Sequence, residues 1–132
     1  MVRLVCVVQG VYYLMRGLWP LVSMDTFVAV TGPKTDLWLV DAVSVLVTVL
    51  ASVLLFAAAR HQITSAIWLL AIASAAALMV VESFYALRGV IWAVHLLDAV
   101  LEVGLIALWI IALFRARHAV TGGAPRHPHP VR

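Results

Sequence analysis

Charged residues and cysteine are scarce in this sequence. Of its 132 residues, 11% are charged and 65% are hydrophobic, and the mean hydropathy is +1.10. A water-soluble domain needs more polar surface than this, so the composition indicates a chain embedded in a membrane. A spanning helix takes about 20 apolar residues, which leaves room for about four helices and for no separate soluble catalytic domain.

Few residues are available for redox, metal or nucleophilic chemistry. Cys6 is the only cysteine, which excludes an intramolecular disulfide, a Cys-x-x-Cys redox pair and a multi-thiolate metal site. His61 and His95 are expected at opposite ends of the helices, which excludes a bis-histidine haem. No motif places a nucleophile beside a histidine, so an enzyme is the less favoured class. We predict no cofactor, no metal site and no nucleic-acid partner.

Hydrophobic runs between helix breakers predict the fold. Transmembrane helices are expected over residues 2–20, 36–59, 63–87 and 95–115. Residues 1–118 are therefore expected to form an all-α membrane domain of four transmembrane helices. Thr35 or Asp36 is placed to cap the second helix through a side-chain oxygen, after a loop that begins at Leu21.

The last part of the chain has a different composition. Residues 119–132 contain glycine, proline and basic residues and little apolar surface, so we expect a disordered basic tail on the cytoplasmic side. His127 and His129 could meet a metal ion there. Two histidines in a flexible chain make an incomplete site, so a basic tail without metal is the favoured interpretation.

Arginine is unevenly distributed between the two ends of the predicted helices. The end shared by both chain termini and the turn at residue 60 carries Arg3, Arg60, Arg115, Arg117, Arg126 and Arg132. The positive-inside bias makes this end cytoplasmic, so both termini are expected there. The opposite, outer end holds all six carboxylates of the chain: Asp25, Asp36, Asp41, Glu82, Asp98 and Glu102.

Two short polar motifs occur twice in the same order. Tyr-x-x-Arg-Gly is found at residues 13–17 and again at 85–89, and Leu-x-Asp-Ala-Val at 39–43 and again at 96–100. This pattern predicts two duplicated helical hairpins, related by an axis along the membrane normal, in an antiparallel bundle. Hydrophobic helices also match by chance, so coincidence is the alternative.

The repeated motifs predict ion pairs at the outer end. Each hairpin is expected to close with an arginine near an aspartate, so that Arg16 and Arg88, together with Asp36, form structural ion pairs or caps. Pairing across the two hairpins is equally compatible with the sequence. Glu102 shares a helical face with His95 and Asp98, but it has no counterpart in the repeat.

Two functional interpretations follow from this polar end. In the first, an outer pocket binds a small cationic or polar ligand or a lipid headgroup. Its candidate residues are Tyr13, Asp41, Tyr85, His95, Asp98 and Glu102. In the second, the charges only fix helix register, the aromatic residues form an interfacial belt, and the protein is an accessory or scaffold subunit that pairs with itself or with a larger membrane complex.

Two segments carry a resemblance to known proteins. Residues 16–21, Arg-Gly-Leu-Trp-Pro-Leu, and the loop over residues 30–40 resemble those of small uncharacterised four-helix membrane proteins of bacteria. The resemblance covers the first half to two thirds of the chain. It implies a four-helix fold in the lipid bilayer of the bacterial inner membrane and no particular activity. Small multidrug exporters have a similar size, but the essential acid of their first helix is missing here.

Overall fold

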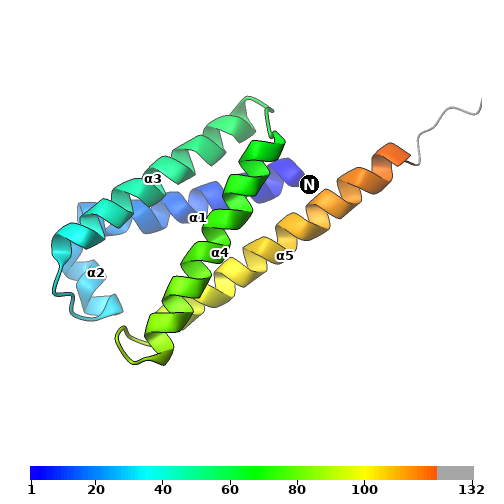
Figure 1. Cartoon of the computed structure of the whole chain (residues 1–132). Coiled ribbons are helices and arrows are strands. Elements are labelled where there is room, and N and C mark those ends of the chain that lie inside the picture. Colours follow the sequence, from blue (N-terminus) through cyan, green and yellow to red (C-terminus); the bar gives the residue numbers. More distant parts are fainter. Residues whose placement is uncertain (122–132) are drawn as a thin grey trace, which may run out of the picture.

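The protein is all-helical in the part of the chain that the structure describes. The computed structural model describes residues 1–121, with side chains up to residue 119. Its helices are α1 (Val2–Val22), α2 (Met24–Thr31), α3 (Leu37–Ala59), α4 (Ser65–Leu87) and α5 (Val94–Thr121), shown in Figure 1. All except α2 are long and apolar enough to cross a membrane. The predicted fold class, an all-α protein with four membrane spans, is confirmed.

The helix boundaries differ from the predicted ones in two places. The segment predicted as a loop after Leu21 contains the eight-residue helix α2. The last helix was predicted to end near residue 115, but it continues to Thr121, so the predicted tail is wrong for residues 119–121. Arginine and alanine favour helix here, and the first glycine stands only at position 122. His127 and His129 lie outside the described residues.

The spans form two antiparallel hairpins. Helix α1 packs mainly against α3, and α4 packs mainly against α5. Between the hairpins, the most extensive contact is that of α1 with α5, whereas α3 and α4 diverge from the turn that joins them (Figure 1). Many large apolar side chains on the outer faces of the helices are exposed, which suits helices that face hydrocarbon.

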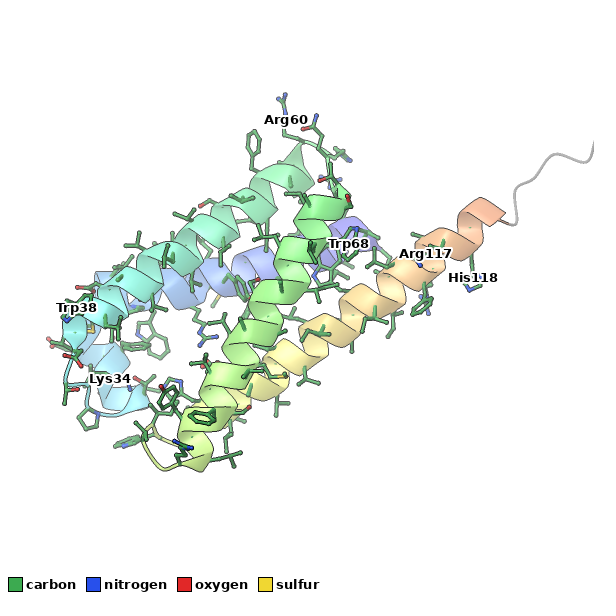
Figure 2. All side chains as sticks on the ribbon, viewed as in Figure 1. Lys34, Trp38, Arg60, Trp68, Arg117 and His118 are labelled. Atoms are coloured by element: carbon green, nitrogen blue, oxygen red, sulfur yellow. The ribbon has the colours of Figure 1, made fainter. Side chains whose placement is uncertain are left out.

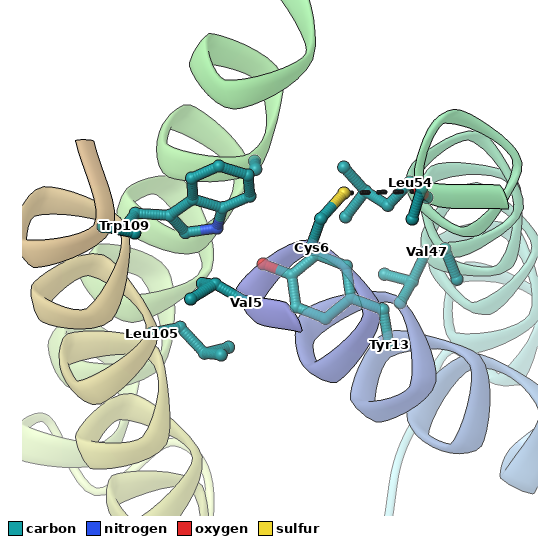
Figure 3. Packing of buried hydrophobic residues seen from close by; sticks show 11 residues of the cluster. Val5, Cys6, Tyr13, Val47, Leu54, Leu105 and Trp109 are labelled. Atoms are coloured by element: carbon teal, nitrogen blue, oxygen red, sulfur yellow. Dashed lines mark hydrogen bonds between the residues drawn. The ribbon is translucent and has the colours of Figure 1, made fainter. Parts of the chain in front are cut away.

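The core is centred on α1. Val5, Cys6 and Tyr13 of this helix lie between Leu54 on one side and Trp109 on the other, as Figure 3 shows. The Cys6 thiol donates a hydrogen bond to the Leu54 carbonyl oxygen at 3.3 Å. All five side chains are at most 3% exposed, so α1 is the helix through which both hairpins share one core.

A glycine allows α1 and α3 to approach closely. A Cβ atom at Gly17 would lie 2.8 Å from the Ser44 carbonyl oxygen and would also clash with Thr48 on the same helix. Without a side chain at this position, the two backbones come into contact. Small residues serve helix association in membranes in this way, because close approach is what gives the van der Waals contact its strength.

Gly17→Val should destabilise the protein by pushing α1 away from α3. Overpacking of a helix contact costs about 1–3 kcal/mol, and we expect a lower midpoint of thermal unfolding in detergent. Gly104→Val is the matched control, since a Cβ at the exposed Gly104 meets no atom within 4 Å. An equal loss of stability in both variants would contradict the close α1–α3 contact.

Candidate functional site

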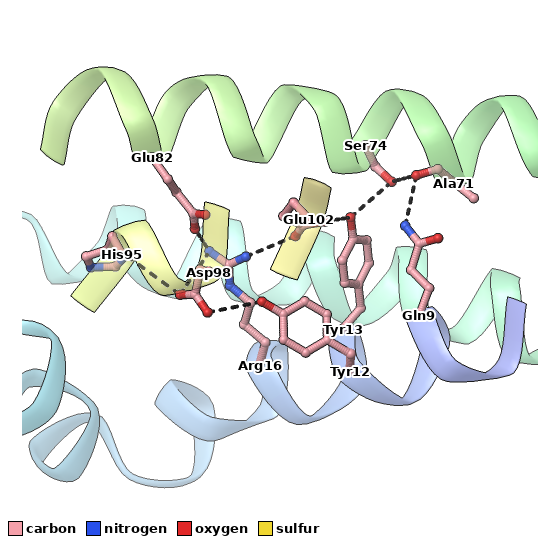
Figure 4. A network of polar contacts seen from close by, with 10 residues as sticks. All are labelled: Gln9, Tyr12, Tyr13, Arg16, Ala71, Ser74, Glu82, His95, Asp98 and Glu102. Carbon is pink, nitrogen blue, oxygen red and sulfur yellow. Dashed lines mark hydrogen bonds and ion pairs between the residues drawn. The ribbon is translucent and has the colours of Figure 1, made fainter. Parts of the chain in front are cut away.

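A polar network joins the two hairpins near the end of the bundle where α2 lies. Helix α1 contributes Gln9, Tyr12, Tyr13 and Arg16, which occupy positions i, i+3, i+4 and i+7 of one helical face. Figure 4 shows these side chains directed toward α4 and α5. Helix α4 contributes Ser74 and Glu82, and α5 contributes His95, Asp98 and Glu102.

Arg16 is at the centre of this network. Its guanidinium forms an ion pair with Glu82 on α4. On α5, it lies 3.3 Å from Glu102 Oε1 and 3.8 Å from Asp98 Oδ2. One side chain of α1 therefore contacts carboxylates of both helices of the other hairpin (Figure 4). The polar network thus fixes how the two hairpins face each other.

Two tyrosines complete the hydrogen bonding of the acids on α5. The Tyr13 hydroxyl donates to Glu102 Oε2 at 3.1 Å, and the Tyr12 hydroxyl donates to Asp98 Oδ1 at 3.0 Å. The Glu102 side chain is 0% exposed and has one contact on each oxygen. The Asp98 side chain is 29% exposed, so it is the acid of this group that is open to a ligand.

The network contains more acids than bases. Three carboxylates, those of Glu82, Asp98 and Glu102, lie around the single guanidinium of Arg16. If all three acids are ionised and His95 is neutral, the group has an excess of two negative charges. Uncompensated charge is costly in a helix bundle within a membrane. The site therefore favours protons or an added cation as the balancing charge.

His95 and Glu82 have buried polar atoms without hydrogen bonds. Neither ring nitrogen of His95 has a hydrogen-bond partner in the described part of the chain, and its Nδ1 lies 3.9 Å from Asp98 Oδ2. Glu82, His95 and Asp98 each offer one ligand atom, and these atoms all lie within 4.8 Å of one another. These three residues could hold a metal ion, although the sequence predicted no metal site.

Two cavities reach this network from the side. The first, of about 550 Å³, is lined by the aromatic side chains of Tyr12, Trp19 and Phe27 and by Arg16, His95 and Asp98, among others. The second, of about 670 Å³, is lined by Arg16, Phe27, Lys34, Tyr85 and His95 among others. Both volumes lie in the range of small-molecule pockets. A ligand in either cavity would lie beside Arg16 and His95.

The loop after α2 forms part of the wall of the second cavity. The Lys34 amine donates to the carbonyl oxygens of Thr31 and Gly32, at 2.9 and 3.2 Å, where it caps the end of α2. Burial lowers the pKa of this amine from its ordinary value. Gly32 has a positive φ of 91° and lies against the ring of Trp92, a position that only glycine can fill without strain.

The structure brings together five of the nine residues that the sequence singled out: Tyr13, Arg16, His95, Asp98 and Glu102. The expected pairing within each hairpin is wrong for Arg16, because its aspartate is Asp98 of the other hairpin, the alternative that the sequence left open. Helix lengths and loops cannot decide between these pairings. The way in which the two hairpins pack against each other decides it.

The other four residues lie apart from the network. Asp41 is exposed on α3, and Tyr85, 44% exposed, lines the second cavity. The Arg88 guanidinium lies 4.1 Å from the centre of the Phe84 ring and forms no ion pair with the described acids. Asp36 occupies the N-cap of α3, but the predicted side-chain cap is wrong, because its carboxylate makes no cap hydrogen bond there.

The sequence analysis missed a second polar layer further along α1. The Gln9 amide donates to the Ala71 carbonyl oxygen at 2.8 Å and accepts from Trp109 Nε1 at 2.6 Å. Glu82 was also left out of the candidate site. The spacing of Gln9, Tyr13 and Arg16 on one face of the first helix was the signal that this helix has a polar face to satisfy.

Comparisons with models of protein families, with curated proteins and with solved structures found no match to this chain.

Arg16→Gln should strongly destabilise the protein. It leaves the buried carboxylates of Glu82 and Glu102 without their cation, and breaking a buried pair costs about 3–5 kcal/mol. Arg88→Gln is the matched control. It removes the same residue type where the guanidinium lies on an exposed ring, and it should cost less than about 1 kcal/mol. Thermal unfolding in detergent measures both, and equal losses would show that Arg16 does not organise the bundle.

Proposed function

We propose that this chain is a multi-pass protein of the bacterial inner membrane that binds a small cation at the outer end of its helices. The observation that carries the proposal is the charge of the network, in which three carboxylates surround one guanidinium. A purely structural lock needs no excess of acid, because one buried arginine is satisfied by one or two carboxylates. Binding of a cation at the site would account for the excess of two negative charges.

The first cavity supports this proposal as the route to the site. Asp98, the most exposed of the three acids, lies in its wall together with His95. Tyr12, Trp19 and Phe27 form its aromatic side, and aromatic faces attract cations at close range. An anionic ligand would meet Asp98 in this wall, where the guanidinium of Arg16 is already paired with Glu82 and Glu102. The composition of the cavity therefore favours a cation over a phosphate or a carboxylate.

A panel of cations tests the proposal. Tetramethylammonium, sodium and zinc chlorides would each be added to the purified full-length protein in detergent, and the thermal unfolding midpoint measured. A cation that binds only the folded protein stabilises it by about 2.7 kcal/mol at 100 times its Kd. We expect at least one of the three to raise the midpoint by several degrees.

Variants of two aspartates locate the effect. Asp98→Asn should remove most of the shift caused by the cation, because the carboxylate in the cavity wall is lost. Asp41→Asn is the matched control at the corresponding position of the predicted repeat, where the side chain is exposed, and it should keep the full shift. If no cation raises the midpoint of the wild type, cation binding is wrong and the accessory or scaffold subunit becomes the better hypothesis.

The proposal includes an orientation with both termini in the cytoplasm. Arg60 and Arg117 lie at the end opposite Lys34 and Trp38 (Figure 2), and the positive-inside bias makes the arginine-rich end cytoplasmic. Under this orientation the network faces the outside. A duplicated hairpin stays a prediction, and the site would then use the arginine of the first copy and the aspartate of the second.

Cysteine labelling on intact cells measures the orientation. Thr35→Cys, in the exposed loop before α3, should react with an impermeant maleimide added from outside. Arg60→Cys, at the turn between α3 and α4, should react only after the membrane is permeabilised. Cys6 is buried and contributes little background. The reverse labelling pattern would place the cation site on the cytoplasmic side.

A further inference from the structure

We infer that the cation is a divalent transition-metal ion bound by Glu82, His95 and Asp98. This inference rests on the proposed cation-binding function and names the chemical class of its ligand. The three residues come from the last turns of α4 and the first turns of α5, on either side of the loop that joins these helices. The short loop between α4 and α5 therefore keeps the three donor residues close together, and one hairpin supplies the whole site.

The donor atoms lie close enough together for a metal site, although somewhat farther apart than they would be around a bound ion. The three ligand atoms lie within 4.8 Å of one another, and His95 Nδ1 is 3.9 Å from Asp98 Oδ2. Metal–ligand bonds of about 2.0–2.2 Å bring donors to roughly 3–3.5 Å from each other. The side chains of Glu82 and Asp98 can rotate, so we expect their rotation, rather than a movement of the helices, to cover this difference.

The unsatisfied atoms of the site point to an absent partner. Both nitrogens of His95 and the Oε2 atom of Glu82 are buried and make no hydrogen bond with the described residues. His95 is 9% exposed and Glu82 is 5% exposed. Buried polar atoms are normally paired, and leaving them unpaired costs free energy. A metal ion would satisfy a nitrogen of His95 and an oxygen of Glu82 at once.

The charge of the network matches a divalent ion. Arg16 can remain paired with Glu102, whose Oε1 atom is 3.3 Å away and whose other oxygen accepts from Tyr13. Glu82 and Asp98 then carry the two excess negative charges. One divalent ion between them makes the network neutral, whereas a monovalent cation leaves one charge uncompensated. Low dielectric strongly favours the neutral arrangement.

The donor types distinguish between divalent ions. Magnesium and calcium prefer sites made entirely of oxygen, whereas an imidazole nitrogen favours zinc, iron, cobalt, nickel or copper. Three protein ligands leave at least one coordination position open, as in sites where the ion meets water or exchanges. Asp98 and His95 line the first cavity, so this position faces the cavity and the ion can enter and leave there.

Zinc binding tests the inference on the full-length protein in detergent. After treatment with a chelator, the wild type should bind one Zn²⁺ per chain by calorimetry. X-ray absorption of the zinc complex should show a single imidazole ligand among oxygen ligands. Zero or two imidazoles would overturn the site, and this measurement needs no variant.

Variants identify the histidine. His95→Ala should weaken Zn²⁺ binding by at least about 100-fold, more than the loss of an outer-shell partner usually costs. His61→Ala, at the opposite end of the bundle, is the matched control and should bind as the wild type does. The double variant His127→Ala, His129→Ala removes the tail imidazoles and should also bind normally. Unchanged zinc affinity in His95→Ala would overturn the inference.

The same data separate the two proposals. If tetramethylammonium or sodium stabilises the wild type through Asp98 while Zn²⁺ does not bind, the metal inference is wrong and cation binding stands. If none of the three cations binds, both are wrong. If His95→Ala does not fold, two other measurements test the metal site. One is the number of imidazole ligands in the wild-type spectrum. The other is the Zn²⁺ affinity of Glu82→Gln, which should be at least about tenfold weaker than that of the wild type.

Discussion

The ion pairing of Arg16 is the interaction on which the rest of the structure depends. Apolar burial does little to join helices that already lie in hydrocarbon, so polar contacts and close packing must do it. Arg16 stands on a helix packed against α3, yet its ion-pair partners, Glu82, Asp98 and Glu102, all belong to the other hairpin. Removing this guanidinium would leave no ion pair of the network between the hairpins, and only apolar contacts, the tyrosine hydrogen bonds to α5 and the Gln9 layer would hold the two hairpins in register.

This role explains why α1 is the least apolar of the four spans. Gln9 and Arg16 interrupt its hydrophobic run, and each contacts both α4 and α5. Gly17, on the side of α1 that faces α3, allows the backbones to touch there. The residues that weaken the hydropathy of the first span are thus the ones that attach it on both sides. A more apolar α1 would cross a membrane more readily but would bind its neighbours less specifically.

The sequence predicted the helices better than the way in which they pack against one another. Four spans could be predicted because runs of about 20 apolar residues are typical of membrane-spanning helices. Helix α2 is too short to give such a run. His95, Asp98 and Glu102 could be grouped because one helix fixes their spacing. Glu82 could not be added to them, since its place depends on how α4 packs against α5. The repeated motif predicted similar roles for Arg16 and Arg88, but the two arginines have different surroundings in the structure.

Burial divides the three acids of the network into different roles. The sequence placed Glu102 among the candidate ligand residues, although it has no counterpart in the repeat. In the structure its side chain is fully buried, and its two oxygens are taken by Arg16 and Tyr13, so it serves as the counter-charge of the arginine. Asp98 is partly exposed in the cavity wall, and Glu82 retains an oxygen without a hydrogen bond. Under the proposed function, these two acids and His95 would therefore exchange the cation, while the pair of Arg16 with Glu102 would keep the helices in place.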